Sequence, residues 1–252
     1  MTFARVAAGL IVVALCAAGA RADDRVATAH GALTIHPIHH ASLMLTWQGK
    51  HILVDPAPID DAKDPTTPYR ALPTPDIILI THIHGDHFNV PILEAVVNSN
   101  TDIYCPMNVF NALPDNLKSQ AVGLMNDAQV DSRGVTISTV EMQNTTPERL
   151  KFHPPGAGNG YVLTMGGKRI YVAGDTEETP ELAQLKDIDV AFIPMNLPWT
   201  ETVEAAAKWV RDFKPKIVYP YHYRNADGTF SDLQKFKALV GNASEVRIRN
   251  WY

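Results

Sequence analysis

The stretch IILITHIHGDH, residues 77–87, joins the pattern of a buried strand to a dense set of metal-binding side chains. Its first residues are aliphatic and are bounded by a proline and by polar residues, which predicts a buried strand over 76–81. Directly after it come the potential ligands His82, His84, Asp86 and His87. A surface loop that is merely rich in histidine rarely combines ligand types in this way behind a hydrophobic strand. The pattern therefore predicts a metal centre at the end of this strand.

The spacing within the motif predicts two ions side by side. His82 and His84 are two residues apart, so in an extended segment their side chains point to the same side and can face one ion. Gly85 allows the chain to turn sharply, after which Asp86 and His87 can face a second ion. Imidazole and carboxylate ligands without thiolate suit Zn²⁺ and also tolerate Mn²⁺ or Fe²⁺.

This H-x-H-x-D-H motif resembles that of the metallo-β-lactamase superfamily. The resemblance runs from about Ile38 to the C-terminus, and His40-Ala41-Ser42 and Gly174-Asp175-Thr176 are similar to elements of its lactonase-like and phospholipase-D-like branch. It implies an α/β (α+β) fold, the four-layer αββα sandwich, with the metals at one edge. An oxygen-reducing di-iron relative is disfavoured, because its motif usually carries Glu where this chain has His84 and nothing here resembles its flavin domain.

The resemblance implies three further ligands. Asp175 would bridge the two ions, although an Asp at a strand end is more often a turn former or a helix cap. His222 would be the last ligand, the alternative being a packed core histidine. His153 would complete the first site, with Asn144 or Glu141 as alternative oxygen ligands. The implied sites are thus His82, His84 and His153 on one ion, Asp86, His87 and His222 on the other, and Asp175 between them.

Three residues outside these sites are also candidates. Asp55 matches a buried family Asp that orients a ligand histidine through its second nitrogen, and the alternative is a turn Asp before Pro56. His40 could reach the cleft and bind substrate, or could be a structural histidine. Arg224, just past His222, could bind an anionic group of the substrate, or could be a solvated surface arginine.

These residues together predict a dinuclear metal-dependent hydrolase. Two adjacent cations lower the pKa of a bridging water, so hydroxide is available as the nucleophile, and Asp86 could accept and pass on the proton. The expected reaction is cleavage of an ester-like bond, a lactone, phosphodiester or amide, in a small or amphiphilic molecule. The alternatives are a β-lactam hydrolase, and a periplasmic metal-binding or sensing protein without turnover.

Composition and the N-terminus bear on partners and location. The net charge of −5 argues against a broad basic surface, so we expect a small-molecule substrate and no nucleic acid. Arg5, the apolar run 6–18 and Ala20-Arg21-Ala22 predict a signal peptide over 1–22, cut before Asp23, with an uncleaved anchor as the alternative. Residues 23–252 would then form one periplasmic or secreted domain with no stable membrane insertion. Its oligomeric state is left open.

Secondary structure follows from periodicity and turn signals. Cys105, the one cysteine after the predicted cut, is expected to be a buried small hydrophobe. Hairpins are expected over 41–47 with 51–54 and over 161–165 with 169–173. Further strands are expected over 103–104, 135–142, 190–194 and 217–219, and helices over 91–97, 113–122, 202–213 and 231–240. Residues 56–75 are expected to form an irregular loop.

Overall fold

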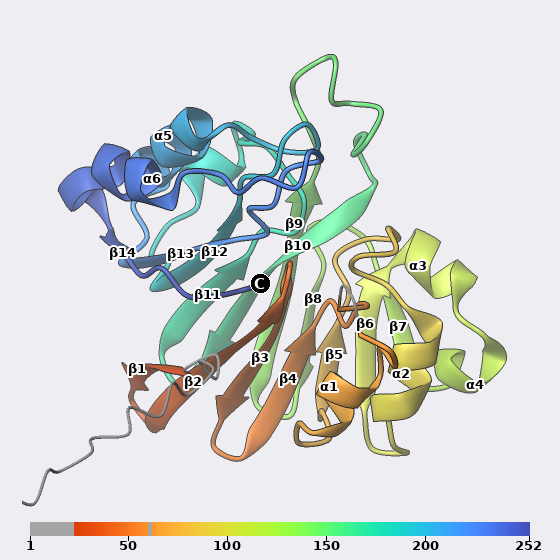
Figure 1. Ribbon diagram of the computed structural model, residues 1–252. Coiled ribbons are helices and arrows are strands. Elements are labelled where there is room, and N and C mark those ends of the chain that lie inside the picture. Colours follow the sequence, from red (N-terminus) through yellow and green to blue (C-terminus); the bar gives the residue numbers. More distant parts are fainter. Residues whose placement is uncertain (1–22, 60–61) are drawn as a thin grey trace, which may run out of the picture.

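The computed structural model describes residues 23–59 and 62–252 (Figure 1). The expected signal peptide, residues 1–22, lies outside the described residues. Within the described part of the chain, every helix is too short or too polar to cross a membrane.

The first half of the chain forms a seven-stranded sheet whose strands lie side by side in chain order. They are β1 (Asp24–Thr28), β2 (Gly31–His39), β3 (Ser42–Trp47), β4 (Lys50–Val54), β5 (Ile77–Leu79), β6 (Asp102–Pro106) and β7 (Ala121–Leu124). The first four strands pair antiparallel, and β4 to β7 pair parallel.

The second half repeats this arrangement in a second seven-stranded sheet. Its strands are β8 (Gln129–Ser132), β9 (Val135–Met142), β10 (Gly158–Met165), β11 (Lys168–Val172), β12 (Val190–Pro194), β13 (Ile217–Tyr221) and β14 (Glu245–Val246). Here β8 to β11 pair antiparallel and β11 to β14 pair parallel. Only the short link 125–128 joins the two sheets along the chain.

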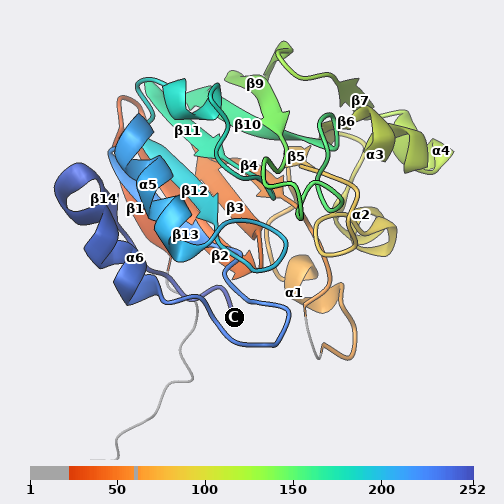
Figure 2. The same cartoon turned by 90° about the horizontal axis from the view of Figure 1, so that it is seen from above.

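Helices cover the outer face of each sheet, which makes four layers (Figures 1 and 2). Outside the first sheet lie α1 (Thr67–Arg70), α2 (Val90–Val96), α3 (Met107–Ala112) and α4 (Asp115–Lys118). Outside the second sheet lie α5 (Val203–Phe213) and α6 (Leu233–Val240). The short 3₁₀ helices are η1 (Leu182–Gln184) and η2 (Gly241–Ala243). A large apolar core between the sheets contains Leu43, Leu163 and Phe192 and continues to α5. A smaller core packs β5 and β6 against α2 and α3. The expected αββα sandwich is confirmed.

Most expected elements are present, with one clear error. Strands β9 and β12 and the hairpin β10–β11 lie where expected, and α5 begins after Thr202, whose side chain caps it. The expected helix over 113–122 is wrong, because only Asp115–Lys118 is helical and Ala121–Leu124 is strand β7. This strand pairs parallel with β6, so its conformation comes from a partner distant in the sequence. Strands β1, β2 and β8 and the helix α3 were not expected, and the loop 56–75 contains α1.

Parallel strands bring their ends to one edge, which is where the site forms. The C-terminal ends of β4 and β5 lie in register, as do those of β12 and β13, and β11 ends opposite Phe192, two residues before the end of β12. Side chains that follow these strands therefore gather at that edge. They are Asp55, His82, Asp175, Asn196 and His222.

Candidate metal centre

Three histidine nitrogens converge in a first group at this edge. His82 follows β5 and His84 comes two residues later, and the Nε2 of His82 lies 2.9 Å from the Nδ1 of His84. The Nε2 of His153, from the loop between β9 and β10, lies 3.3 Å from the same Nδ1 atom. Two neighbouring residues of the motif and one distant histidine thus face one point.

A second group forms beside the first. The Oδ2 of Asp86 lies 3.3 Å from the Nε2 of His222 and 3.8 Å from the Nε2 of His87. His87 and His222 are buried, whereas 46% of the Asp86 side chain is exposed. The second group therefore has one side open to solvent.

Asp175 lies between the two groups. Its Oδ2 is 3.7 Å from the Nε2 of His153 in the first group and 3.4 Å from the Nε2 of His222 in the second. Its Oδ1 is 3.4 Å from the Nε2 of His87. The buried carboxylate thus faces both groups at once.

These separations fit a pair of divalent metal ions. Ligand atoms on one tetrahedral ion, at about 2.0–2.1 Å from it, stand about 3.3 Å apart. Within each group the candidate ligand atoms all lie within 4.8 Å of one another. The Nε2 of His87 and the Oδ1 of Asp175 are buried and face each other at 3.4 Å without forming a hydrogen bond, and a bound cation would satisfy both atoms.

Burial and charge divide the histidines into two kinds. Burial lowers the pKa of His82 and of His153, so both are neutral, as metal binding requires. Burial acts in the same direction on His222, but the carboxylates of Asp175 and Asp86 outweigh it and raise the pKa of His222 to about 9. The pKa of His87 is raised for the same reason. Metal ions would therefore displace protons from this second pair.

A buried carboxylate fixes the orientation of His87. Asp55 follows β4, and its Oδ2 lies 2.8 Å from the Nδ1 of His87, so the expected contact with a histidine of the motif is present. The Asp55 carboxylate also accepts hydrogen bonds from the backbone N–H and the hydroxyl of Thr81, each at 2.7 Å. These contacts direct the Nε2 of His87 towards Asp175.

The turn of the motif forms differently from the expectation for Gly85. Its φ is not positive, and a Cβ added there would meet no atom within 4 Å. The turn is closed instead by hydrogen bonds from the N–H groups of His87 and Phe88 to the carbonyl of His84. The glycine that close packing requires is Gly158, where an added Cβ would clash with the carbonyl oxygen of Thr81 and stand 2.9 Å from the Cβ of His82.

Two asparagines that the sequence reasoning did not place as supports contact the histidines, one at the nitrogen of His153 that faces away from the first group and the other at the nitrogen of His222 that faces the carboxylates. The Nδ2 of Asn144 lies 3.2 Å from the Nδ1 of His153, so Asn144 supports that histidine rather than replacing it. Glu141, the other alternative, accepts a hydrogen bond from the N–H of Gly156 and stands outside the ligand groups. The Nδ2 of Asn196 lies 3.2 Å from the Nε2 of His222. A polar residue two positions after a buried strand was the signal that could have revealed Asn196.

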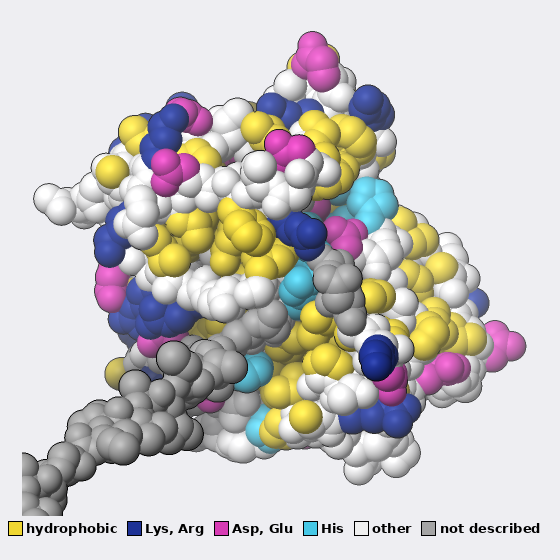
Figure 3. All heavy atoms as spheres, viewed as in Figure 1, with side chains coloured by type: hydrophobic (Ala, Val, Ile, Leu, Met, Phe, Trp, Pro, Cys, Tyr) yellow, Lys and Arg dark blue, Asp and Glu magenta, His cyan; other side chains and the backbone are white. Residues whose placement is uncertain are grey.

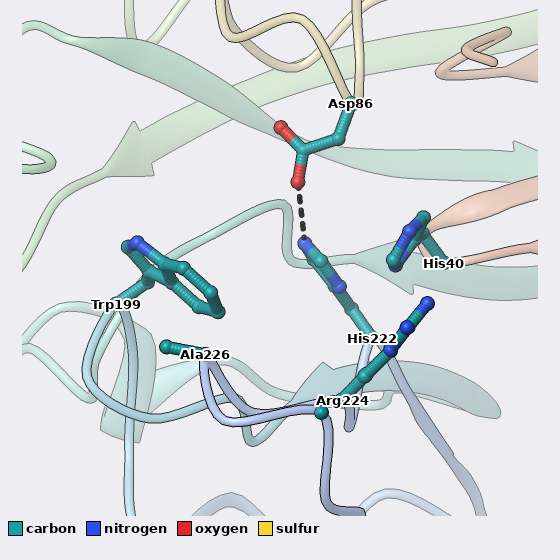
Figure 4. Close-up of a pocket in the computed structure, with 7 residues that line it drawn as sticks. His40, Asp86, Trp199, His222, Arg224 and Ala226 are labelled. Atoms are coloured by element: carbon teal, nitrogen blue, oxygen red, sulfur yellow. Dashed lines mark ion pairs between the residues drawn. The ribbon is translucent and has the colours of Figure 1, made fainter. Parts of the chain in front are cut away.

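A hollow of about 410 Å³ opens beside the second group (Figure 4). His40 and Arg224 line one side of it and Trp199 the other, with Asp86 and His222 between them. A second hollow of about 260 Å³ lies against the first group and shares Asp86 and Trp199. Figure 3 shows histidine, acidic and basic side chains together in the middle of this face, with hydrophobic side chains on both sides.

Comparison with known proteins gives consistent matches. A family model described as a beta-lactamase superfamily domain matches residues 50–223. A metal-dependent hydrolase of the UPF0173 group from Thermococcus kodakarensis is 31% identical over 83% of this chain and 92% of its own length. A crystal structure of a proposed metal-dependent hydrolase from Parabacteroides distasonis is 41% identical, covers 91% of this chain and 99% of its own, and superposes with a TM-score of 0.80. A metallo hydrolase of Ignicoccus hospitalis shares the fold at 22% identity and a TM-score of 0.70, over 86% of this chain and 94% of its own.

Proposed function

The chain belongs to the metallo-β-lactamase superfamily, among its metal-dependent hydrolases, and on that premise we propose that it is a dinuclear enzyme that cleaves an ester-like bond. The bond is that of a lactone, a phosphodiester or an amide in a small or amphiphilic molecule. Zn²⁺ is the first candidate metal, because the donor set is imidazole and carboxylate without thiolate, with Mn²⁺ or Fe²⁺ as substitutes.

The position of Asp175 is the observation that carries this proposal. A metal-sequestering protein needs one ligand set per ion, whereas this buried carboxylate faces His153 on one side and His87 and His222 on the other. A shared ligand holds two ions close together, which is what joint action on one bond requires. We assign His82, His84 and His153 to one ion, Asp86, His87 and His222 to the other, and Asp175 to both.

The side chains around the ions have distinct tasks. When bound, the two ions supply Lewis-acid polarisation of the bond under attack and make water acidic enough to act as a nucleophile near neutral pH. Burial would raise the pKa of Asp86, but His87 and His222 hold it well below its usual range, so the carboxylate is ionised and suited to bind a cation. Its exposed side faces both hollows, and from this position we propose that it relays a proton to the leaving group.

The proposed location is the periplasm or the outside of the cell. It rests on the N-terminal sequence, in which Arg5 precedes the apolar run 6–18 and Ala20-Arg21-Ala22 offers a cleavage site before Asp23. Sequencing the N-terminus of the protein recovered from cell fractions tests it: a start at residue 1 in the cytoplasmic fraction would refute export.

Metal analysis combined with turnover tests the enzyme proposal. We expect about two metal ions per purified chain and activity on at least one of the lactone, phosphodiester, amide and β-lactam panels. His82→Ala should lose both most of one ion and the activity, whereas His30→Ala, which removes an exposed histidine remote from the motif, should keep both. Activity that survives His82→Ala unchanged would refute the two-metal mechanism. Two bound ions without turnover on every panel would identify a metal-binding protein instead.

A further inference from the structure

Two hollows of different chemistry meet at the metal-binding residues. The larger one is polar, with His40 and Arg224 opposite Trp199 (Figure 4). The smaller one is lined by residues of the metal centre and by two others, Phe152 and Trp199, both aromatic. Because Asp86 and Trp199 line both hollows, a molecule positioned at the metal centre would have one part in each.

The aromatic pair is held in place by the site itself. The N–H of Trp199 donates to the carbonyl of Asn196, and its own carbonyl accepts a hydrogen bond of 2.7 Å from Asn144. These two asparagines also contact His222 and His153. Trp199 is therefore fixed relative to both ligand groups while its side chain remains half-buried.

Phe152 is fixed by the loop that carries His153. Its N–H donates to the carbonyl of Arg149, and Arg149 forms an ion pair of 2.5 Å with the buried Glu177. The ammonium group of Lys151 lies 4.9 Å from the centre of the Phe152 ring. The ring is half-buried, so it offers an ordered apolar surface beside the first ligand group.

We propose that Trp199 and Phe152 form a specificity subsite for a flat apolar group, an aryl ring, attached to the bond that is cleaved; this rests on the proposed hydrolase function. A cavity of about 150 Å³ lined by apolar side chains is enough to hold benzene. The hollow of about 260 Å³ therefore has room for a ring and the atoms that join it to the reacting group. The polar remainder of the substrate lies in the hollow of His40 and Arg224.

Binding of two phosphonates to the zinc-loaded protein tests this without requiring turnover. Phenylphosphonate and methylphosphonate carry the same metal-binding group and differ in the ring. We expect phenylphosphonate to bind about tenfold more tightly to the wild type, the size expected for contact with aromatic side chains. Trp199 is half-buried and Trp47, Trp209 and Trp251 are buried, so ring binding should also quench mainly Trp199 fluorescence.

Variants assign the ring's advantage to the proposed residues. Trp199→Ala and Phe152→Ala should each remove most of the tenfold ratio between the two affinities, whatever effect they share on both ligands, and Trp199→Phe should retain most of that ratio. Phe110→Ala removes a half-buried aromatic that lines neither hollow and should keep the full advantage. Far-ultraviolet circular dichroism and metal content are measured for every variant, so a misfolded one is replaced by the other alanine variant or by the Phe substitution.

The outcomes separate this subsite from the enzyme proposal. The wild type binding both phosphonates equally would overturn the subsite alone, provided that two metal ions remain bound. An advantage that persists in both alanine variants would overturn it as well. A folded wild type that holds no metal and binds neither phosphonate would overturn the proposed function together with the subsite.

Discussion

Replacing Asp55 with asparagine changes one atom of the buried carboxylate that orients His87. Asp55 is fully buried and accepts hydrogen bonds from the backbone and hydroxyl of Thr81, while lying 2.8 Å from the Nδ1 of His87. If the amide oxygen keeps the backbone contact, the new NH₂ group faces His87 and stabilises the ring tautomer with its proton on Nε2. That nitrogen is the proposed metal ligand, so metal binding must then displace the preferred tautomer.

The expected size of the effect follows from these contacts. Loss of a second-sphere partner weakens metal binding about 10- to 100-fold, which is roughly 1.4–2.7 kcal/mol. Loss of a hydrogen bond to a charged group costs about 1.5–3 kcal/mol of unfolding free energy. The Asp55→Asn variant should therefore bind one of the two ions 10- to 100-fold more weakly and unfold at lower denaturant concentration.

Competition with a chelating dye measures the metal affinity, and urea unfolding of the metal-free protein measures stability. Asp189→Asn is the matched control, because Asp189 is a buried carboxylate that accepts a backbone hydrogen bond from Arg169 at the opposite end of β11 and β12. That variant should lose stability and keep metal affinity. If Asp55→Asn behaves the same way, losing stability while holding both ions at wild-type affinity, the orienting role is wrong.

Further predictions concern other buried groups. Burial raises the pKa of Glu201 to about 8, so its neutral form stabilises the fold below the unfolded pKa of about 4.5, and this stability is lost as pH rises towards 8. Glu201→Gln should therefore flatten the fall in melting temperature between pH 5 and 8. An unchanged slope of melting temperature against pH would contradict this. Gly158→Ala should cost about 1–3 kcal/mol and weaken metal binding, because the new Cβ crowds the carbonyl oxygen of Thr81 and the Cβ of His82. Gly85→Ala, with open space around it, should be tolerated, and equal effects of the two variants would show that crowding is not the cause. Cys105 is buried and its pKa is raised to about 12, so it should react with a disulfide reagent only after unfolding, and rapid labelling of the native protein would disprove that.

The parts of the site that could be predicted from the sequence share a local signal. His82, Asp175 and His222 each come within three residues after the end of a parallel strand formed by an apolar run, and parallel strands end at one edge. An apolar run of this kind therefore predicts a strand, and it also predicts that the residues just after it lie at the edge of the sheet where the site forms. His153 lacked this signal, since its loop is irregular, and it was placed by resemblance alone.

The parts that could not be predicted depend on contacts between distant segments. Trp199 contributes to the cleft because Asn144, from another loop, fixes its backbone. Strand β7 forms by pairing with β6, although Val122 within it is 45% exposed and its own sequence favoured a helix. Tyr252, at the far end of the sequence, contacts a residue of the cleft, because its hydroxyl lies 3.0 Å from the Nδ1 of His40. Periodicity reports burial and local conformation, and none of these contacts is local.

Each half of the chain builds one sheet, and neither half carries all the residues of either candidate ion site. The motif 82–87 belongs to the first half, while His153, Asp175 and His222 belong to the second, and the covalent connection between the halves is the link 125–128. Bound metal would therefore hold the two halves together through ligands from both. If the chain is cut within that link, the two fragments should associate more tightly when zinc is supplied. Removal of the metal by a chelator should weaken the association of the halves before either sheet unfolds.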